Sequence, residues 1–182
     1  MKSPPSSRLI RWFAALMAVT YWLPLPAQTM AAVAEDRLKA AFVYNFILFT
    51  DWPADALGEG APLNLCVNAD SALRPALADL GGKLVKGRRI LVQPFAVPGA
   101  VRNCQVVFLD SLDRDHWPRI SKNLGSASVL TISDDDDIGH SGAVIALDLV
   151  DNRIAFDIDL KSARQARLVL SSKLLRLART VQ

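Results

Sequence analysis

The stretch that decides the fold class is QVVFL at residues 105–109, a short and almost wholly apolar run. Such a run is typical of a strand that is covered on both faces, as the strands of parallel sheets are. Runs of the same kind stand at residues 63–67 (LNLCV), 89–95 (RILVQPF) and 129–132 (VLTI). The sequence therefore predicts four short strands spread along the chain.

More polar stretches with helical character separate these strands. Residues 71–80 and 115–124 are predicted to be helices, with Ser71 as the candidate cap of the first. Strands that alternate with helices in this way favour a single α/β domain, with a mainly parallel sheet flanked by helices.

The ends of the domain complete this prediction. An apolar stripe at residues 35–50 predicts a buried first helix, and residues 161–179 are predicted to form one final helix. Between them, residues 143–149 and 153–158 predict a late antiparallel hairpin near an edge of the sheet, with its turn at residues 151–152.

The first 34 residues have the layout of a secretory signal peptide. Three basic residues are followed by an apolar run at residues 12–25 and by the A-x-A-like sequence AVA at residues 32–34. The run is too short and too interrupted by proline for a comfortable membrane span. We expect residues 1–34 to be removed on export to the periplasm, leaving residues 35–182 as one mature domain.

Removal of this leader changes the charge of the protein. The chain has 21 Lys and Arg against 18 Asp and Glu, and the leader holds three of the basic residues and none of the acids. The mature part is therefore neutral overall, which argues against binding to nucleic acid. Residues 161–182 nevertheless hold six basic residues and no acid, so a basic C-terminal element follows an acidic body.

Cys66 and Cys104 are the two cysteines of the chain. Cys66 falls in the first predicted strand and Cys104 directly precedes the third, and these two strands are neighbours in flavodoxin-like sheets. Because an exported protein meets oxidising conditions, we expect the pair to form a disulfide.

No pattern for catalysis or metal binding stands out. The four aspartates at residues 134–137 lack the alternating ligand spacing of a calcium loop, and we expect a solvated acidic turn there. His116 and His140 do not have zinc-ligand spacing, and no serine lies in a G-x-S-x-G sequence. The sequence therefore predicts no catalytic residue, no metal site and no cofactor, and the protein is not expected to be an enzyme.

The final helix offers one candidate binding surface. At 100° per residue, Leu168 and Leu175 fall opposite the core stripe, among cations that include Arg164 and Arg176. Two leucines ringed by arginines suit a partner-binding strip. The alternative is that the apolar first helix covers them.

Several segments, taken in order, carry a family resemblance. They are KAAFVYNF at 39–46, DWP at 51–53, LCV at 65–67, KGR at 86–88, CQVVF at 104–108, FDID at 156–159 and ARLVLSSKLLRLA at 166–178. Together they span nearly all of the mature region, which resembles the YfiR family of periplasmic proteins. The family usually has Asn at the position of Asp159 and Gly at the position of Arg167.

The resemblance implies a periplasmic α/β regulator. Members of the family bind the periplasmic domain of a membrane diguanylate cyclase and hold it inactive, and an outer-membrane lipoprotein relieves this repression. Cyclic-di-GMP output and biofilm formation follow. Cys66 and Cys104 match a family cysteine pair that is linked to redox sensing.

Two functions of different classes therefore stand. The first is repression of a membrane diguanylate cyclase, and the second is a periplasmic small-ligand sensor module acting on a histidine kinase or another membrane receptor. A homodimer is a further expectation for the state in which the protein acts.

Overall fold

The computed structural model describes residues 27–95, 98–150 and 153–182. The charged start and apolar run of the expected leader, within residues 1–26, lie outside the described residues, as does the expected turn at residues 151–152. In the part of the chain that is described, no helix combines the length and the apolar character needed to cross a membrane.

The elements follow one another as short strands and helices. The strands are β1 (Thr50–Asp51), β2 (Leu63–Asn68), β3 (Leu84–Val85), β4 (Arg88–Phe95), β5 (Val106–Leu109), β6 (Leu130–Ser133), β7 (Ile145–Val150), β8 (Arg153–Ile158), β9 (Val169–Leu170) and β10 (Thr180–Val181). The α-helices are α1 (Ala27–Leu48), α2 (Arg74–Ala78), α3 (Trp117–Leu124), α4 (Asp136–His140), α5 (Leu160–Gln165) and α6 (Ser172–Leu177). Short 3₁₀ helices are η1 (Ala54–Ala56), η2 (Pro98–Asn103) and η3 (Ser111–His116).

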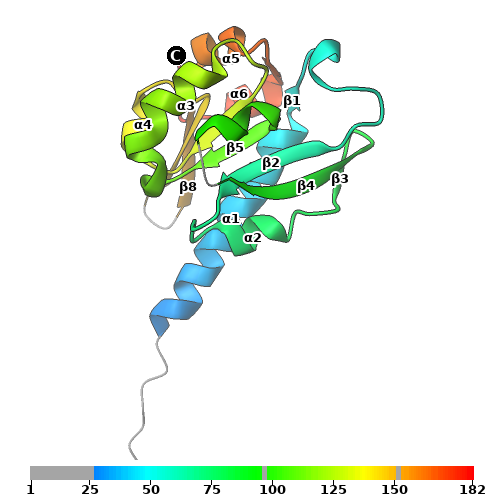
Figure 1. The fold of residues 1–182 in the computed structure, drawn as a ribbon. Helices are drawn as coiled ribbons and strands as arrows, with labels where there is room; N and C mark the ends of the chain where they lie inside the picture. The colour runs from blue at the N-terminus through cyan, green and yellow to red at the C-terminus, as the bar shows by residue number, and fades with distance from the viewer. Residues whose placement is uncertain (1–26, 96–97, 151–152) are drawn as a thin grey trace, which may run out of the picture.

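A twisted sheet forms the centre of the molecule, in the order β10-β8-β7-β6-β5-β2-β4-β3 (Figure 1). Strands β4, β2, β5, β6 and β7 run parallel to one another. Strand β8 runs antiparallel to β7, and β3 runs antiparallel to β4. The predicted α/β domain, with a mainly parallel sheet and a late antiparallel hairpin, is confirmed.

Successive side chains of each central strand point to opposite faces of the sheet, as strand geometry requires. On one face, Leu65 of β2 and Phe108 of β5 are fully buried in a core that also contains residues of α1 and α2. On the other face, Cys66 and Val107 from the same two strands pack with residues of α3. Each central strand therefore contributes to two cores, which explains why its sequence is a nearly unbroken apolar run.

The first helix is longer than expected and only one side of it is buried. It begins at Ala27 rather than at residue 35 and ends at Leu48, just before β1. Val43, Phe46 and Ile47 are at most 1% exposed, whereas Ala41 is exposed. The sequence pattern was thus correct about the buried side, but the opposite side of α1 is open.

The prediction of one final helix at residues 161–179 is wrong. This segment forms α5, the short strand β9, then α6 and the edge strand β10. Strand β9 pairs with β1, with Leu170 opposite Thr50, and β10 pairs with β8. In one continuous helix the backbone N–H and C=O groups of this segment would bond to one another. Here the backbone groups of β9 and β10 bond instead to the neighbouring strands β1 and β8.

Local residues also divide this segment. Arg167 has a φ of 55°, in the left-handed region that ends helices and is usually occupied by glycine. Ser171 then caps α6, because its side chain accepts a hydrogen bond from the Leu174 N–H. A helix ends at the first of these positions and a new one begins at the second.

The remaining differences concern the ends of elements. Helix α2 is one short turn of five residues rather than ten. The Ser71 hydroxyl accepts a hydrogen bond from the N–H of Leu73, the residue that directly precedes this helix. The helix expected at residues 115–124 is divided into η3 and α3, with Pro118 in the first turn of α3.

Candidate functional site

The disulfide between Cys66 and Cys104 is present, as expected. It joins β2 to the residue that precedes β5 by two positions, on the face of the sheet that carries α3. The two Cα atoms lie 5.9 Å apart, within the usual range for a disulfide, and each cysteine is 3% exposed. The bond is therefore enclosed in the core rather than displayed at the surface.

The carboxyl ends of β2 and β5 are where ligands bind in many open α/β sheets, because the strand order reverses there. In this protein the position is filled by the chain's own polar groups. The Asn68 side-chain amide donates to the Asp113 carboxylate over 2.7 Å, and the Asp110 N–H donates to the same carboxylate over 3.2 Å. Asp113 is 1% exposed, and burial raises the pKa of its carboxyl.

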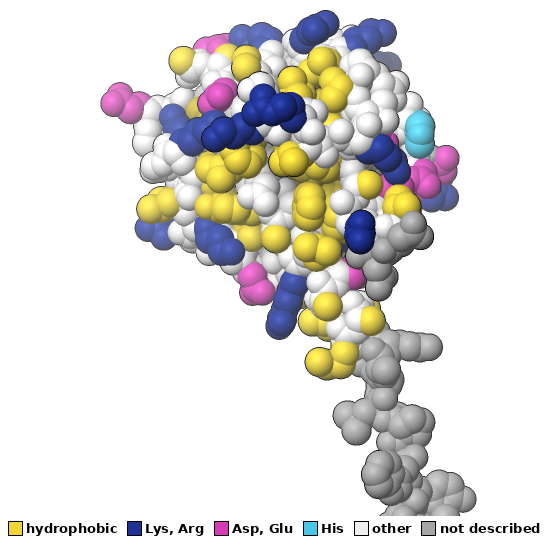
Figure 2. Space-filling view, turned by 180° about the vertical axis from the view of Figure 1, so that it is seen from behind, with side chains coloured by type: hydrophobic (Ala, Val, Ile, Leu, Met, Phe, Trp, Pro, Cys, Tyr) yellow, Lys and Arg dark blue, Asp and Glu magenta, His cyan; other side chains and the backbone are white. Residues whose placement is uncertain are grey.

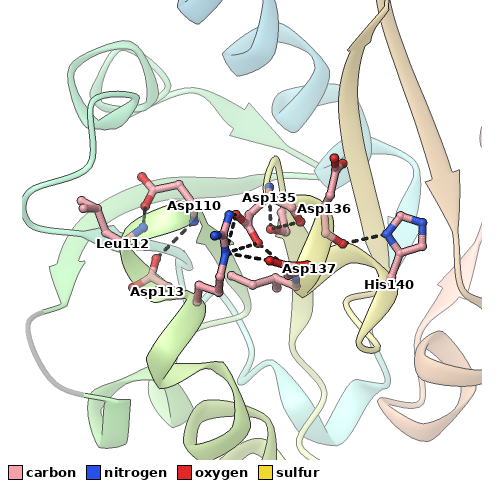
Figure 3. Close-up of polar contacts among 10 residues, drawn as sticks. Asp110, Leu112, Asp113, Asp135, Asp136, Asp137 and His140 are labelled. Atoms are coloured by element: carbon pink, nitrogen blue, oxygen red, sulfur yellow. Dashed lines mark hydrogen bonds and ion pairs between the residues drawn. The ribbon is translucent and has the colours of Figure 1, made fainter.

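The next strand end carries a second carboxylate network (Figure 3). The Asp135 carboxylate caps α4 by accepting from the Ile138 N–H, and it accepts from Arg114 Nε over 3.1 Å. The hydrogen bond from Arg114 holds the pKa of Asp135 below its usual value. Arg114 also pairs with Asp137 over 3.0 Å, and His140 Nδ1 lies 2.7 Å from the Asp136 carbonyl oxygen.

The expectation of a solvated acidic turn at residues 134–137 is therefore wrong for two of the four aspartates. Asp135 is 6% exposed. Asp134 is mostly buried and its carboxylate accepts a hydrogen bond from Lys39 Nζ over 2.8 Å. Lys39 also pairs with Glu35 over 3.0 Å, so one ammonium fastens α1 to the end of β6.

These hydrogen-bond networks join helices and loops of the fold to the ends of the strands. The buried carboxylates accept hydrogen bonds from side chains or backbone of the same chain, as buried charges must to be tolerated. Among the residues that the structure describes, no three His, Cys, Asp or Glu side chains are placed to hold a metal ion.

The open side of α1 is the more promising surface. Leu38 is 41% exposed and Ala41 and Asn45 are exposed, while Phe42 and Phe49 are half-buried beside them. Phe42 and Phe46 pack edge-on against Phe156 of β8, with ring centroids 6.2 and 4.9 Å apart. We call the exposed side of α1 together with α6 the α1–α6 face.

The start of α6 lies next to the C-terminal end of α1, and the chain just after α6 contacts β8. The Ser171 N–H, at the start of α6, donates to the Phe49 carbonyl, and the Arg179 N–H, just after it, donates to the Phe156 carbonyl. Figure 2 shows this side of the molecule, with hydrophobic side chains gathered across its middle and Lys and Arg side chains along its upper part. An apolar centre with a charged rim is the usual anatomy of a reversible protein interface.

The four residues expected to form a partner-binding strip are not brought together on one helix. Leu168 lies between α5 and β9 and is 5% exposed, so it belongs to the core. Leu175 lies on α6, half-buried, and Arg176 is exposed beside it. Arg164 is exposed on α5. The helical face that would have aligned Leu168 with Leu175 does not exist, because the segment is not one helix.

Sequence reasoning missed the role of Lys39, Arg114 and the open side of α1. A lysine and an arginine facing carboxylates 95 and 21 residues away carry no local signal. The exposed positions 37, 38, 41 and 45 do recur at helical spacing, but they interleave with the buried stripe and include two small residues.

The chain is similar to known proteins in its sequence and in its structure. The sequence model of the YfiR/HmsC-like family matches residues 36–179, which is most of the chain. No curated protein matches the chain.

Two solved structures are similar to the chain at low sequence identity. One is a conserved domain protein from Vibrio cholerae O1 biovar El Tor, with a TM-score of 0.49, 9% identity, and 81% of this chain covered against 60% of the other. The second is the ABC domain in complex with L-Trp from Streptococcus pneumoniae, with a TM-score of 0.52, 10% identity, and 71% of this chain covered against 59% of the other. The chain thus spans about three fifths of each. At this identity the second likeness concerns the fold alone.

Proposed function

Because the chain belongs to the YfiR/HmsC-like family, we propose that it binds the periplasmic domain of a membrane-bound diguanylate cyclase and holds the enzyme inactive. Cyclic-di-GMP output and biofilm formation would then rise when the protein is absent or sequestered. An outer-membrane lipoprotein is the proposed sequestering partner.

The observation that carries this proposal, beside the family match, is the α1–α6 face. A helix that covers a sheet normally turns charged or polar residues outward. Here the outward side of α1 carries the apolar Leu38 and Ala41 between Arg37 and Asn45, flanked by half-buried aromatic rings. Protein interfaces have centres depleted in charge and enriched in aromatic residues, so this face suits a protein partner.

The polar networks at the carboxyl edge support a regulatory rather than a catalytic role. The carboxylates of Asp113, Asp134 and Asp135 already accept hydrogen bonds from Asn68, Lys39 and Arg114. A general acid or base needs to reach a substrate proton within hydrogen-bond distance. These groups instead hold α1, η3 and α4 against the sheet.

The test is to delete the gene in the source bacterium and to measure cyclic-di-GMP by mass spectrometry. We expect an increase that disappears when the partner cyclase is deleted as well. The exported full chain should restore repression, whereas a matched version lacking residues 1–34, and therefore retained in the cytoplasm, should not. Unchanged cyclic-di-GMP in the deletion strain would reject the proposal.

A second candidate function, small-ligand sensing, has one observation in its favour. A hollow of about 160 Å³ lies between the segment after α1 and β3, lined by residues that include Trp52, Lys86 and Arg88. Lys86 pairs with Asp51, which also lines the hollow, and Arg88 donates to the Gly58 and Ala61 carbonyls, so the indole ring of Trp52 is the group best placed to contact an aromatic ligand. L-Trp is therefore a sensible first probe, and a rise in melting temperature with L-Trp, abolished by Trp52→Ala, would favour this function.

A further inference from the structure

The outward side of α1 has a regular shape. Leu38, Ala41, Asn45 and Leu48 recur at three- and four-residue spacing, and Arg37 lies beside Leu38, so the five residues form one stripe along the helix axis. The small side chain of Ala41 at its centre leaves room for the backbone of a second helix, and the polar Asn45 lies one turn further along.

Larger side chains border this stripe on both sides. On one side, Phe42 packs against Phe156 of β8. On the other, the Tyr44 hydroxyl donates to the Leu84 carbonyl of β3 over 3.3 Å, and Lys83 Nζ lies 5.5 Å from the Tyr44 ring centroid. Neighbouring elements therefore hold both borders in place, which leaves little reorganisation for a partner to induce.

Three exposed cations lie on α1 and on α6, whereas the acids of α1 nearest to Arg37, Glu35 and Asp36, are half-buried. Arg37 lies on α1, and Lys173 and Arg176 lie on α6; all three are exposed. None of them makes an ion pair with any residue in the described part of the chain.

The acids near the C-terminal segment do not compensate these cations. Asp148 and Asp157 pair with Arg179 over 3.0 and 2.6 Å. Asp159 caps α5, with its carboxylate accepting from the Ser162 N–H. The positive charge of Arg37, Lys173 and Arg176 is therefore free to act on a partner.

We infer that the stripe on α1 binds an amphipathic helix of the partner's periplasmic domain, whose apolar side lies over Ala41 and whose flanks carry Asp or Glu. This inference rests on the proposed function. A helix that docks on an apolar surface contacts it through residues i, i+3, i+4 and i+7 of its own sequence, so the partner's apolar side would show that spacing. The acidic flanks would meet Arg37 near one end and the α6 cations near the other.

The same charges argue against a second copy of this chain as the occupant. A symmetric pairing of two such faces would bring the cations of one copy close to those of the other, and like-charge juxtaposition across an interface is costly. A self-associated form is nevertheless one outcome that the experiment must detect.

Three variants separate these possibilities. Ala41→Trp places a large side chain at the exposed centre of the stripe. Lys173→Glu with Arg176→Glu reverses the charge of α6. The matched control is Lys161→Glu with Arg164→Glu, which reverses the same number of exposed, unpaired cations. These cations lie on α5, which lies next to α3 because Ser162 and Gln165 line a hollow together with residues of α3.

Binding is measured with purified exported protein and the periplasmic domains of the source bacterium's membrane diguanylate cyclases, in 50 and 500 mM NaCl. We expect Ala41→Trp to lower affinity by about 10-fold or more, as blocked interface centres do. The α6 reversal should lower affinity about 10-fold at low salt and less at high salt, whereas the α5 control should stay within about twofold.

Failure of this inference differs from failure of the proposed function. If gene deletion raises cyclic-di-GMP while Ala41→Trp and the α6 reversal bind as well as wild type, the proposed function stands and the α1 stripe is not the contact. If light scattering shows a wild-type dimer that Ala41→Trp dissociates, the stripe joins two copies of the chain and the inference is overturned. Should Ala41→Trp lower the melting temperature, the α6 reversal decides alone.

Discussion

Helix α1 and the C-terminal segment at residues 160–182 meet where β9 pairs with β1, the strand that follows α1, but they are held by different forces. Helix α1 is one element of 22 residues whose inner side is buried against the sheet. The C-terminal segment crosses the molecule in four short pieces, two of them strands of two residues each. The first depends on side-chain burial, and the second on backbone pairing, caps and one left-handed residue.

The difference shows that apolar spacing alone does not make a helix. Both segments carry leucine, alanine or phenylalanine at three- and four-residue intervals. In the C-terminal segment, the Leu168 N–H bonds back to the Ala163 carbonyl and the Ser171 N–H bonds to the Phe49 carbonyl. The second of these bonds, between residues far apart in the sequence, replaces a bond that a continuous helix would make internally. Four substitutions test this contrast.

The largest effect should come from Phe46→Ala on the inner side of α1. Phe46 is 1% exposed and packs against the rings of Phe42 and Phe156. Truncation of such a side chain leaves a cavity, and we expect a loss of about 3–5 kcal/mol in the free energy of unfolding, measured by urea titration. Asn45→Ala, one residue away but exposed, should change it by less than about 0.5 kcal/mol. Equal effects from the two would mean that α1 does not cover the sheet.

Leu168→Ala tests whether the C-terminal segment also has a buried anchor. Leu168 is 5% exposed, and we expect a loss of about 2–4 kcal/mol by the same titration. The matched control is Leu177→Ala on α6, because Leu177 is 71% exposed and should matter little for stability. If Leu168→Ala leaves the free energy of unfolding unchanged, Leu168 is not part of the core and lies at the surface, as one continuous helix would require.

Lys39→Met tests the ion pair that fastens α1 to the end of β6. Burial raises the pKa of the Asp134 carboxyl above its usual value even beside Lys39. Without the ammonium, the buried carboxylate loses its partner, and we expect a cost of about 1–3 kcal/mol at pH 7.

The sign of the pH dependence follows from this raised pKa. Asp134 takes up its proton in the folded protein at a higher pH than in the unfolded chain, so protonation favours the folded state as the pH falls. The stability gap between wild type and Lys39→Met should therefore narrow between pH 7 and about pH 4. A gap that widens on acidification would contradict the buried pair, and Lys161→Met serves as the exposed control.

The smallest effect should come from Arg167→Gly. Arg167 has a φ of 55°, so glycine would relieve a strain of about 1 kcal/mol. The substitution also removes the exposed ion pair between Arg167 and Asp55, which solvent screens, so we expect little net change.

Arg167→Val gives the contrast that makes this prediction sharp. A β-branched residue tolerates positive φ poorly, and we expect a loss of at least about 1 kcal/mol. Thermal unfolding of the two variants in parallel measures the difference. If valine and glycine behave alike, the left-handed conformation at this position is not what ends α5.

The resemblance noted in the sequence agrees with this geometry at two positions. Glycine, usual in the family at the position of Arg167, suits the left-handed backbone found there. Asparagine, usual at the position of Asp159, would cap α5 as Asp159 does, because both side chains offer an oxygen to the Ser162 N–H. Neither departure disturbs the local fold.

The candidate binding surface was only partly accessible from sequence. Arg164 and Arg176 are exposed and Leu175 is half-buried, as a surface strip requires. For Leu168 the structure supports the alternative of burial, because it is 5% exposed and lies in the same core as Phe46 of α1. Helical geometry was assumed across Arg167, where the backbone changes direction. The buried carboxylates at Asp134 and Asp135 were missed because a run of like charges usually lies in solvent.

The central sheet, its burial on both faces and the disulfide could be predicted from the amino-acid sequence. Continuous apolar runs are local signals, and the order of such strands predicts which ones are neighbours, including those of Cys66 and Cys104. The fold of the C-terminal segment and the burial of particular carboxylates could not be predicted in this way. Those outcomes depend on partners such as Thr50, Phe49 and Lys39, which lie about 95 to 122 residues away along the chain and leave no trace in the local pattern.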